Sequence, residues 1–382
     1  MSKFSYPNDI LRKIFDEYYD KILNAPKINK TEIDKFLIES DLGYSLKEFL
    51  TLPFDKLIEC AKILDLHKSE TTLNLNINYA KSLVQMKEDF NYTEILKSSI
   101  SPFFMKFSSI LNIKTCYYCN IDFVNSYIPF KNDYSDFFEL VNEGDIDDLS
   151  KIIGITKPYA KIIRNKCNGT IKTVRDLEVK LKNHSEILAF LLSAKNSDGG
   201  ILFENLKNQK NHYTIDHILP QSKFPFFSLC LYNLIPSCYT CNSKLKKSKM
   251  LSENYKELAK FSPTSEKYEN PLNFKLFYKG LYSIINLPTE LEQYDVKLET
   301  SDNYPDFFNL QGRYNFHKNE SLKLIKQRKI YSDSQIDEIS KLLKMDVKEI
   351  RKHLFGPSIF EDNTNEPFEK YKKDIAKQLT II

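Results

Sequence analysis

Glycine is scarce in this sequence. Only nine glycines occur among 382 residues, while long stretches are rich in Lys, Glu, Leu and Ile. Because glycine weakens helices and Lys, Glu and Leu favour them, this composition indicates a mostly helical protein. Hydrophobic residues make up 42% of the chain, which is enough to build real cores. The length allows one large domain or two to three ordinary ones.

Long apolar runs are also missing. No window approaches ~18 uninterrupted apolar residues, so no membrane span is expected. The opening residues, MSKFSYPNDILRKIF, lack the apolar core and small-residue cleavage site of a secretory signal. We therefore expect a cytoplasmic protein whose thiols stay reduced. Its seven cysteines are accordingly considered first as metal ligands and last as disulfides.

The charge is close to balanced. The 55 basic and 51 acidic residues leave a formal net charge of +4, which does not by itself indicate a nucleic-acid partner. Local clusters of charge must carry that argument. The sequence also has no internal repeat, no low-complexity segment and no G-x-x-x-x-G-K-[ST] phosphate loop. Any ATPase partner would therefore have to be a separate chain.

Hydrophobic spacing divides the chain into three regions. Residues 1–110 carry apolar residues at three-to-four spacing, which predicts helices. Residues 111–250 have aromatic and β-branched residues around a C-x-x-C, typical of a short hairpin or knuckle, and a helical insertion over 136–185. Residues 251–382 contain a β-like run, FKLFYKGLYSIINL, and otherwise read as helices. The predicted fold class is mainly α with a small α+β core.

Four of the cysteines form two C-x-x-C pairs. Cys116 pairs with Cys119, and Cys238 with Cys241 in SCYTCNSK. Two such pairs supply the four thiolates that a tetrahedral structural zinc needs, provided that the two segments meet in space. The alternative is two unrelated pairs, one of them redox-active. The remaining cysteines, Cys60, Cys167 and Cys230, have no partner at ligand spacing and are expected to be packing residues.

Polar residues surround the second cysteine pair in a characteristic order. Asp216 and His217 stand side by side in IDHILPQS, Asn233 follows in LYNLIPSC, and Asn242 comes directly after Cys241. Four lysines follow, at Lys244, Lys246, Lys247 and Lys249. His212, five residues before His217, is expected to lie outside the site. Because neighbours on a strand point to opposite faces, Asp216 and His217 can serve one site only if the backbone turns or twists between them.

These residue types suit phosphodiester hydrolysis. The reaction needs a base for water, a cation that neutralises charge on the phosphate and leaving oxygen, and groups that hold the backbone in line. A neutral imidazole, with a pKa near ~6.5, accepts a proton at cellular pH. Carboxylate and amide oxygens are ligands that Mg²⁺ prefers, and lysines bind phosphates. An Asp-His dipeptide alone is more often chance, and a lysine run alone is usually a solvated helix face.

In combination, these residues resemble the ββα-metal core of the HNH endonuclease family, including the HNH domain of RNA-guided CRISPR nucleases. The resemblance implies that His217 is the general base, and that Asp216 and Asn242 hold a catalytic Mg²⁺ or Mn²⁺. It implies that Asn233 ties the loop together through backbone hydrogen bonds. Cys116, Cys119, Cys238 and Cys241 would hold structural Zn²⁺, as in many bacterial HNH proteins. The family usually places a lysine three residues after the final Asn, where this chain has Leu245.

The insertion resembles a second DNA-binding module. Apolar residues in GDIDDLSKIIGITKPYAKIIRNKC have the spacing of two short helices joined at Gly154, as in the helix-hairpin-helix module, whose hairpin amides bind a phosphate. The second glycine of that hairpin is Thr156 here. The alternative is a plain helical insertion with the same apolar pattern.

The resemblance implies a metal-dependent endonuclease acting on double-stranded DNA. The C-terminal third, around FNLQGRYNFHK, is similar to the tails of large bacterial HNH proteins of phage defence. It implies an antiphage effector, restriction-like or partnered with a separate ATPase. Arg313 and His317 in this stretch are expected to be packing residues. Two alternatives stay open: an HNH nuclease that cleaves RNA or tRNA, and a zinc-containing nucleic-acid-binding protein without activity.

Overall fold

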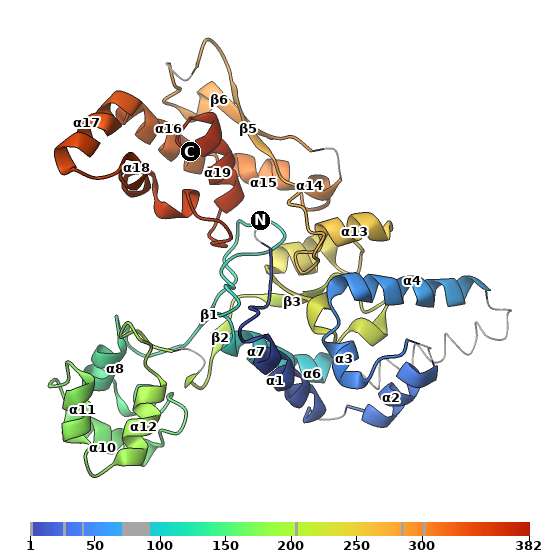
Figure 1. Cartoon of the computed structure of the whole chain (residues 1–382), viewed down its shortest axis with the longest axis vertical. Helices are drawn as coiled ribbons and strands as arrows, with labels where there is room; N and C mark the ends of the chain where they lie inside the picture. The colour runs from blue at the N-terminus through green and yellow to red at the C-terminus, as the bar shows by residue number, and fades with distance from the viewer. Residues whose placement is uncertain are drawn as a thin grey trace. The chain divides into compact units, whose positions relative to one another are not determined.

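The computed structural model describes residues 3–25, 28–39, 42–70, 92–202, 205–283, 286–300 and 303–382. Residues 71–91, which fall in the region predicted to be helical, lie outside the described residues. The chain is about half helical with a few small antiparallel sheets, so the predicted class, mainly α with a small α+β part, is confirmed (Figure 1). Among the described helices, none combines the length and apolar character needed to cross a membrane.

The chain divides into two compact units. The larger contains Met1–Ser99, Leu111–Val124 and Tyr213–Ile382, and the smaller contains Ile100–Ile110 and Asn125–His212. The smaller unit includes the predicted insertion 136–185 and extends beyond it on both sides. The larger unit therefore brings together three segments that are far apart in the sequence.

The larger unit begins with helices that pack beneath the segment between two later strands. These helices are α1 Leu11–Leu23, α2 Lys30–Glu39, α3 Leu46–Leu50, α4 Phe54–Glu70, α6 Tyr92–Ile95 and the π-helix η1 Leu96–Ile100. Tyr18 on α1 donates to the Leu229 carbonyl at 2.6 Å. Phe49 on α3 packs its ring against Phe227, with 5.8 Å between the ring centroids. The N-terminal helices thus pack against residues 218–233, the segment between the two strands.

The middle of the larger unit is a strand pair followed by a helical turn. Strand β3 (Thr214–His217) pairs antiparallel with β4 (Leu234–Ser237), with Asp216 opposite Ile235 and His217 opposite Leu234. Two 3-10 turns, η3 Pro225–Phe227 and η4 Leu231–Asn233, lie between the strands, and the π-helix η5 (Thr240–Lys246) follows β4. Helix α13 (Tyr255–Phe261) comes next. The order is strand, strand, helix.

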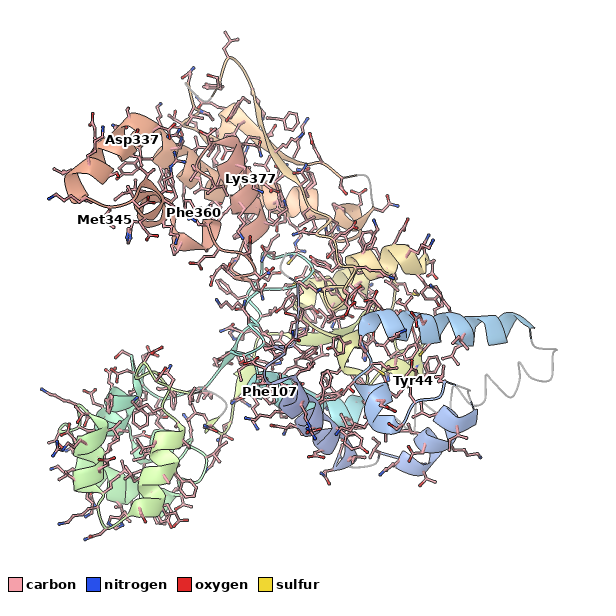
Figure 2. The ribbon with its side chains drawn as sticks, viewed as in Figure 1. Tyr44, Phe107, Asp337, Met345, Phe360 and Lys377 are labelled. Atoms are coloured by element: carbon pink, nitrogen blue, oxygen red, sulfur yellow. The ribbon has the colours of Figure 1, made fainter. Side chains whose placement is uncertain are left out.

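The C-terminal part of this unit is a second strand pair covered by helices. Strand β5 (Phe274–Tyr278), within the run predicted to be β-like, pairs antiparallel with β6 (Tyr294–Leu298). The helices are η6 Leu291–Gln293, α14 Tyr304–Phe307, α15 Leu310–Phe316, α16 Asn319–Ile330, α17 Asp333–Leu343, α18 Val347–Phe355, η7 Pro357–Ile359 and α19 Glu369–Gln378. Side chains of α19 satisfy the free edge of β5: Asp374 accepts from Phe274 N at 3.0 Å, and Gln378 accepts from Leu276 N at 2.9 Å. Figure 2 marks Asp337 on α17 and Lys377 on α19.

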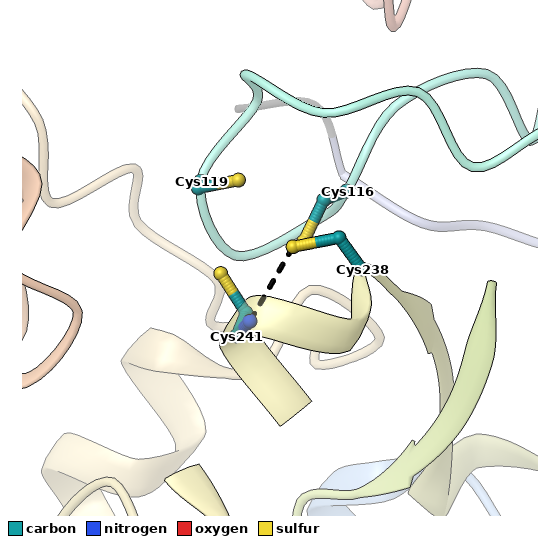
Figure 3. Close-up of side chains that lie close together, drawn as sticks. All are labelled: Cys116, Cys119, Cys238 and Cys241. Carbon is teal, nitrogen blue, oxygen red and sulfur yellow. Dashed lines mark hydrogen bonds between the residues drawn. The ribbon is translucent and has the colours of Figure 1, made fainter. Parts of the chain in front are cut away.

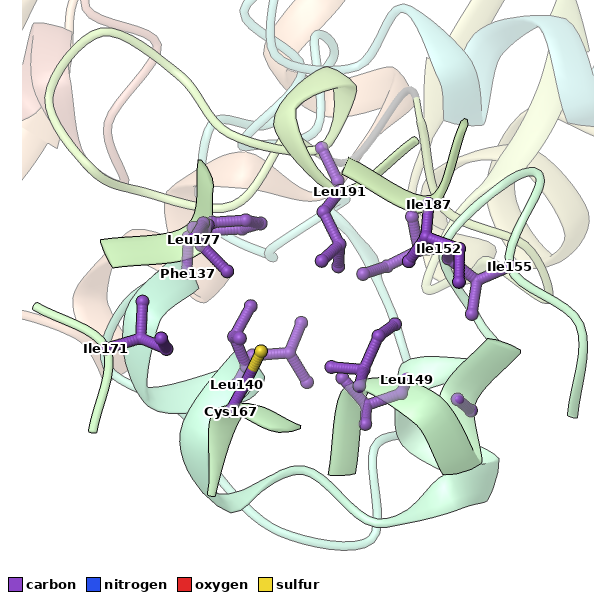
Figure 4. Packing of buried hydrophobic residues seen from close by; sticks show 14 of the residues in the cluster. Phe137, Leu140, Leu149, Ile152, Ile155, Cys167, Ile171, Leu177, Ile187 and Leu191 are labelled. Atoms are coloured by element: carbon purple, nitrogen blue, oxygen red, sulfur yellow. The ribbon is translucent and has the colours of Figure 1, made fainter. Parts of the chain in front are cut away.

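The smaller unit has its own apolar core. Its elements are α7 Ser101–Lys106, β1 Ser126–Tyr127, α8 Phe137–Glu143, α9 Ile146–Leu149, α10 Lys157–Cys167, α11 Val174–Lys180, α12 Ser185–Ser193 and β2 Lys210–Asn211. Residues Phe137, Leu140, Leu149, Ile152 and Leu191 meet in this core (Figure 4). Cys167 is buried there, and Cys60 and Cys230 are buried in the larger unit, so these three thiols lie where packing residues are expected.

Candidate functional site

The two C-x-x-C pairs meet in the larger unit (Figure 3). The sulfurs of Cys116, Cys119, Cys238 and Cys241 all lie within 4.8 Å of one another. All four side chains are buried, and none takes part in a disulfide. The more than one hundred residues that separate the pairs in sequence therefore do not separate them in space.

This four-cysteine cluster could hold a metal such as zinc. Four thiolates at about 2.3 Å from one Zn²⁺ lie about 3.8 Å from each other, so sulfurs already this close need only small shifts to bind the ion. Burial raises the pKa of the Cys119 thiol, but hydrogen bonds from the neighbouring thiols and the charge of Arg313 hold that pKa well below its ordinary value. A thiolate is thus favoured before any metal binds.

Local backbone bonds shape both turns. In the first, Asn120 adopts a left-handed conformation with φ 52° and donates its N–H to the Cys116 carbonyl at 2.8 Å. Left-handed backbone is tolerated better by Asn than by most residues. In the second, at the start of η5, Cys241 N donates to Cys238 Sγ at 3.4 Å. Such amide-to-sulfur bonds stabilise a thiolate ligand.

The C-terminal region surrounds the first cysteine turn. Tyr304 on α14 donates to the Tyr118 carbonyl at 2.9 Å, and Tyr314 on α15 donates to the Cys119 carbonyl at 2.5 Å. Phe368 N donates to the Asn120 carbonyl at 2.8 Å. Residues 251–382 therefore help to position the cluster, a role that the sequence did not indicate.

Arg313 connects the same region to the cluster. Its guanidinium donates to Cys241 Sγ at 3.3 Å and to Asp122 Oδ2 at 3.0 Å. The expectation that Arg313 is a packing residue is therefore wrong, because a charged group beside four thiols compensates their negative charge. His317, in contrast, packs its ring against Phe368 with 5.0 Å between the centroids.

Replacing Arg313 with methionine should weaken zinc retention. Second-layer partners of metal ligands typically contribute about 10- to 100-fold in affinity, so we expect Arg313→Met to release zinc to a chelator at a correspondingly lower chelator concentration. Arg175→Met, which changes an exposed arginine in the smaller unit, is the control. Equal zinc affinity in the two variants would remove Arg313 from the metal centre.

Asp216 is buried at the middle of β3 and carries two close partners. Its side chain is 4% exposed. The Tyr118 hydroxyl donates to Oδ2, and the Lys246 ammonium lies 3.2 Å from Oδ1 and 3.1 Å from Oδ2. Burial and then the charge of Asp216 hold the pKa of Tyr118 well above its ordinary value, so this phenol stays a donor. The carboxylate is therefore hydrogen-bonded by Tyr118 and charge-compensated by Lys246.

His217 contacts a different set of groups. Its Nε2 lies 3.0 Å from the Ser228 carbonyl oxygen, and because a carbonyl only accepts, Nε2 must carry the proton. Nδ1 is then the basic nitrogen. Burial lowers the pKa of His217 to about 4, so the imidazole is neutral at pH 7. The ring of Tyr92 packs edge-on against it at 4.5 Å.

The pairing of β3 with β4 continues without a break across Asp216 and His217, and the two side chains bond to separate partners. Tyr92 lies near both. It packs on His217, and its phenol pKa is raised by burial and by the charge of Asp216. Its hydroxyl, like that of Ser228, is buried and makes no hydrogen bond to any described residue. Two buried hydroxyls without partners beside a neutral imidazole are suited to a bound water or another polar ligand.

Asn233 links the ends of the segment between β3 and β4. Its Oδ1 accepts from Leu219 N at 2.7 Å, and its Nδ2 donates to the carbonyls of Leu219 and Phe227, each at 3.0 Å. The residue is fully buried. Three of its four possible side-chain hydrogen bonds thus hold backbone that follows the Asp-His pair.

Asn233→Ala should destabilise the larger unit. The substitution leaves the buried N–H and carbonyl of Leu219 without partners, at about 1–3 kcal/mol each before relaxation, and we expect a loss of about 2 kcal/mol or more. Denaturant unfolding measures it, with Asn286→Ala, at an exposed loop position, as the control. Equal midpoints for the two variants would contradict this role.

Asn242 and the four lysines lie on or just after η5. Asn242 donates through Nδ2 to Thr214 Oγ1 at 2.9 Å and to the Ile215 carbonyl at 3.3 Å, and its Oδ1 accepts no bond from a described side chain or amide. Lys244, Lys247 and Lys249 are exposed, with Lys244 over the Tyr239 ring at 5.8 Å. Lys246 differs: it is fully buried and also donates to the His217 carbonyl at 2.6 Å. Its ammonium is not placed on the solvent-facing surface that a phosphate contact requires.

Gly154 lies in the smaller unit between α9 and α10. It has φ +87°, and a Cβ there would come within 2.2 Å of the Phe190 ring, so both backbone and packing demand glycine. Nearby lysines are paired with aspartates: Lys131 lies 2.9 Å from Asp145, and Lys157 lies 3.1 Å from Asp147. These pairs reduce the positive charge available to a phosphate at the hairpin.

Sequence reasoning missed Tyr118, Tyr92, Arg313 and the pairing of Lys246 with Asp216. Tyr118 stands inside the first C-x-x-C, so its position there was a usable signal. Tyr92 and Arg313 carry no local pattern that points to the site. Comparison of the chain with models of known protein families, with curated proteins and with solved structures finds no match.

Proposed function

We propose that this chain is a metal-dependent HNH endonuclease that hydrolyses DNA phosphodiester bonds. One observation carries the proposal. β3, β4 and η5 follow one another and bear Asp216, His217 and Asn242, with the four-cysteine cluster at the start of η5. The same order of elements and residues defines the core that the sequence resembles.

The donor set suits the catalytic cation that this proposal requires. The Asp216 carboxylate and Asn242 Oδ1 are hard oxygen ligands of the kind Mg²⁺ or Mn²⁺ prefers. The Lys246 ammonium at Asp216 shows that a positive charge is accommodated there. When bound, the cation would neutralise charge on the phosphate and on the leaving 3′ oxygen.

The chain's own residues supply the remaining chemistry. His217, neutral at pH 7 and held through Nε2 by Ser228, presents Nδ1 as the acceptor for a proton from water. Asn233 holds the backbone after the Asp-His pair, so that His217 keeps its orientation. The exposed Lys244, Lys247 and Lys249 are proposed to contact the nucleic-acid backbone. The hairpin at Gly154 is proposed as a second phosphate contact.

The proposal is tested by incubating purified, zinc-loaded protein and Mg²⁺ with supercoiled plasmid and, separately, with tRNA. We expect nicked or linear plasmid and intact tRNA. Cleavage of tRNA alone would replace the DNA substrate with RNA, and no cleavage of either would favour a binding protein. An antiphage role, a restriction-like or ATPase-partnered assembly and a separate ATPase chain stay predictions from the sequence resemblance.

A further inference from the structure

Lys246 places a buried positive charge on the carboxylate proposed as a metal ligand. Its side chain is 0% exposed and that of Asp216 is 4% exposed. The ammonium lies 3.1 Å from Oδ2 and 3.2 Å from Oδ1 of Asp216, so it spans both carboxylate oxygens. Both groups of this ion pair are therefore shielded from water.

The ammonium is also held from a second direction. Lys246 Nζ donates to the His217 carbonyl at 2.6 Å, while the Tyr118 hydroxyl donates to the same carboxylate from the cysteine turn. The lysine therefore rests on backbone and side chain of β3 at once. These contacts fix the Lys246 ammonium beside Asp216 and His217, the two residues with the predicted chemistry.

The π-helical turn of η5 explains how Lys246 reaches this position. The Lys247 amide donates to the Asn242 carbonyl at 2.6 Å, a bond between residues five apart, which widens the turn. Asn242 then lies over Thr214 and Ile215, and Lys246 lies over Asp216 and His217. One turn of helix thus brings the amide ligand and the ammonium to successive positions along the same strand.

A buried carboxylate needs a counter-charge, and the Lys246 ammonium already lies beside both oxygens of Asp216. Leaving it unpaired is costly in a low-dielectric interior, and two cations at the same oxygens repel each other strongly there. A divalent ion that binds Asp216 must therefore displace the lysine. When no metal is bound, the Lys246 ammonium compensates the charge of the buried Asp216 carboxylate.

We propose that the Lys246 ammonium occupies the cation position of Asp216 in the metal-free protein, so that a divalent cation binds only by displacing it. Lys246 then sets the metal concentration at which the site becomes competent. This inference rests on the proposed function, because it takes Asp216 as the ligand of the catalytic cation. It concerns the regulation of that site and not the identity of the nucleic acid.

The test measures Mn²⁺ binding to the full-length, zinc-loaded protein by the loss of the free Mn²⁺ electron paramagnetic resonance signal. We compare wild type with Lys246→Met and Lys246→Gln. Removing a competing charge at contact distance should tighten Mn²⁺ binding by about tenfold or more. Mn²⁺ should also raise the melting temperature of both variants more than that of wild type, since a ligand stabilises the state that it binds. Lys246→Gln keeps a donor for Asp216 and so guards against a folding defect in Lys246→Met.

Two controls separate the inference from the proposed function. Lys244→Met changes an exposed lysine on the same turn and should leave Mn²⁺ affinity unchanged. Asp216→Asn combined with Lys246→Gln should abolish the gain. Equal or weaker Mn²⁺ binding in the Lys246 variants, with plasmid cleavage by wild type intact, overturns the inference alone. No Mn²⁺ binding in any variant and no plasmid cleavage overturn both.

Discussion

Replacing His217 with alanine should lower the rate of Mg²⁺-dependent plasmid cleavage by about 10²- to 10⁴-fold, the usual contribution of a general base. The expectation follows from the state of the imidazole. Burial lowers its pKa to about 4, and the Ser228 carbonyl at 3.0 Å fixes the proton on Nε2. The residue is thus a neutral base with one free nitrogen at pH 7, whatever else the site contains.

His217→Asn distinguishes this role from a structural one. An asparagine amide can still donate to the Ser228 carbonyl, but it cannot accept a proton from water. We expect it to preserve the melting temperature better than alanine and to be as inactive. His212→Ala is the matched control, because His212 packs on Tyr127 at 4.6 Å in the smaller unit. Wild-type cleavage by either His217 variant would remove the residue from the mechanism.

Loss of one cysteine of the cluster should have the largest effect on stability. A structural zinc contributes apparent binding free energies of about 10–16 kcal/mol in small metal-dependent domains. Here the cluster joins residues 116–119 to the start of η5 and receives contacts from α14, α15 and the 365–368 segment. We expect Cys119→Ser to bind much less than one zinc per chain and to lose more than ~10 °C in melting temperature.

Cys60→Ser is the control for that experiment. Cys60 is also buried in the larger unit, so the change makes a similar alteration in volume and polarity without touching the cluster. It should retain full zinc and a higher melting temperature than Cys119→Ser. Metal analysis and differential scanning calorimetry on the two variants decide the matter. If zinc content and melting temperature fell equally in both, the cluster would have no special role.

Local chemistry made parts of this protein predictable. Scarce glycine and three-to-four apolar spacing indicated a mainly helical chain, because helix formation depends largely on nearby residues. The two C-x-x-C pairs predicted a common four-thiol cluster, since each pair has ligand spacing on its own. The order of Asp216, His217, Asn233 and Asn242 predicted that the candidate site lies in the segment 216–242.

Other features came only from chain segments that meet in space. Lys246 was predicted, with the lysines around it, to contact a phosphate, but the π-helical turn and the pairing of β3 with β4 bury it against Asp216. Arg313 reaches Cys241 from a helix more than seventy residues later, and Tyr92 reaches His217 from the N-terminal helices. No local pattern marks such contacts, because burial and ion pairing depend on which distant surfaces pack together. The sequence by itself determined which residues can do chemistry, and the tertiary structure decided which charges and hydroxyls surround them.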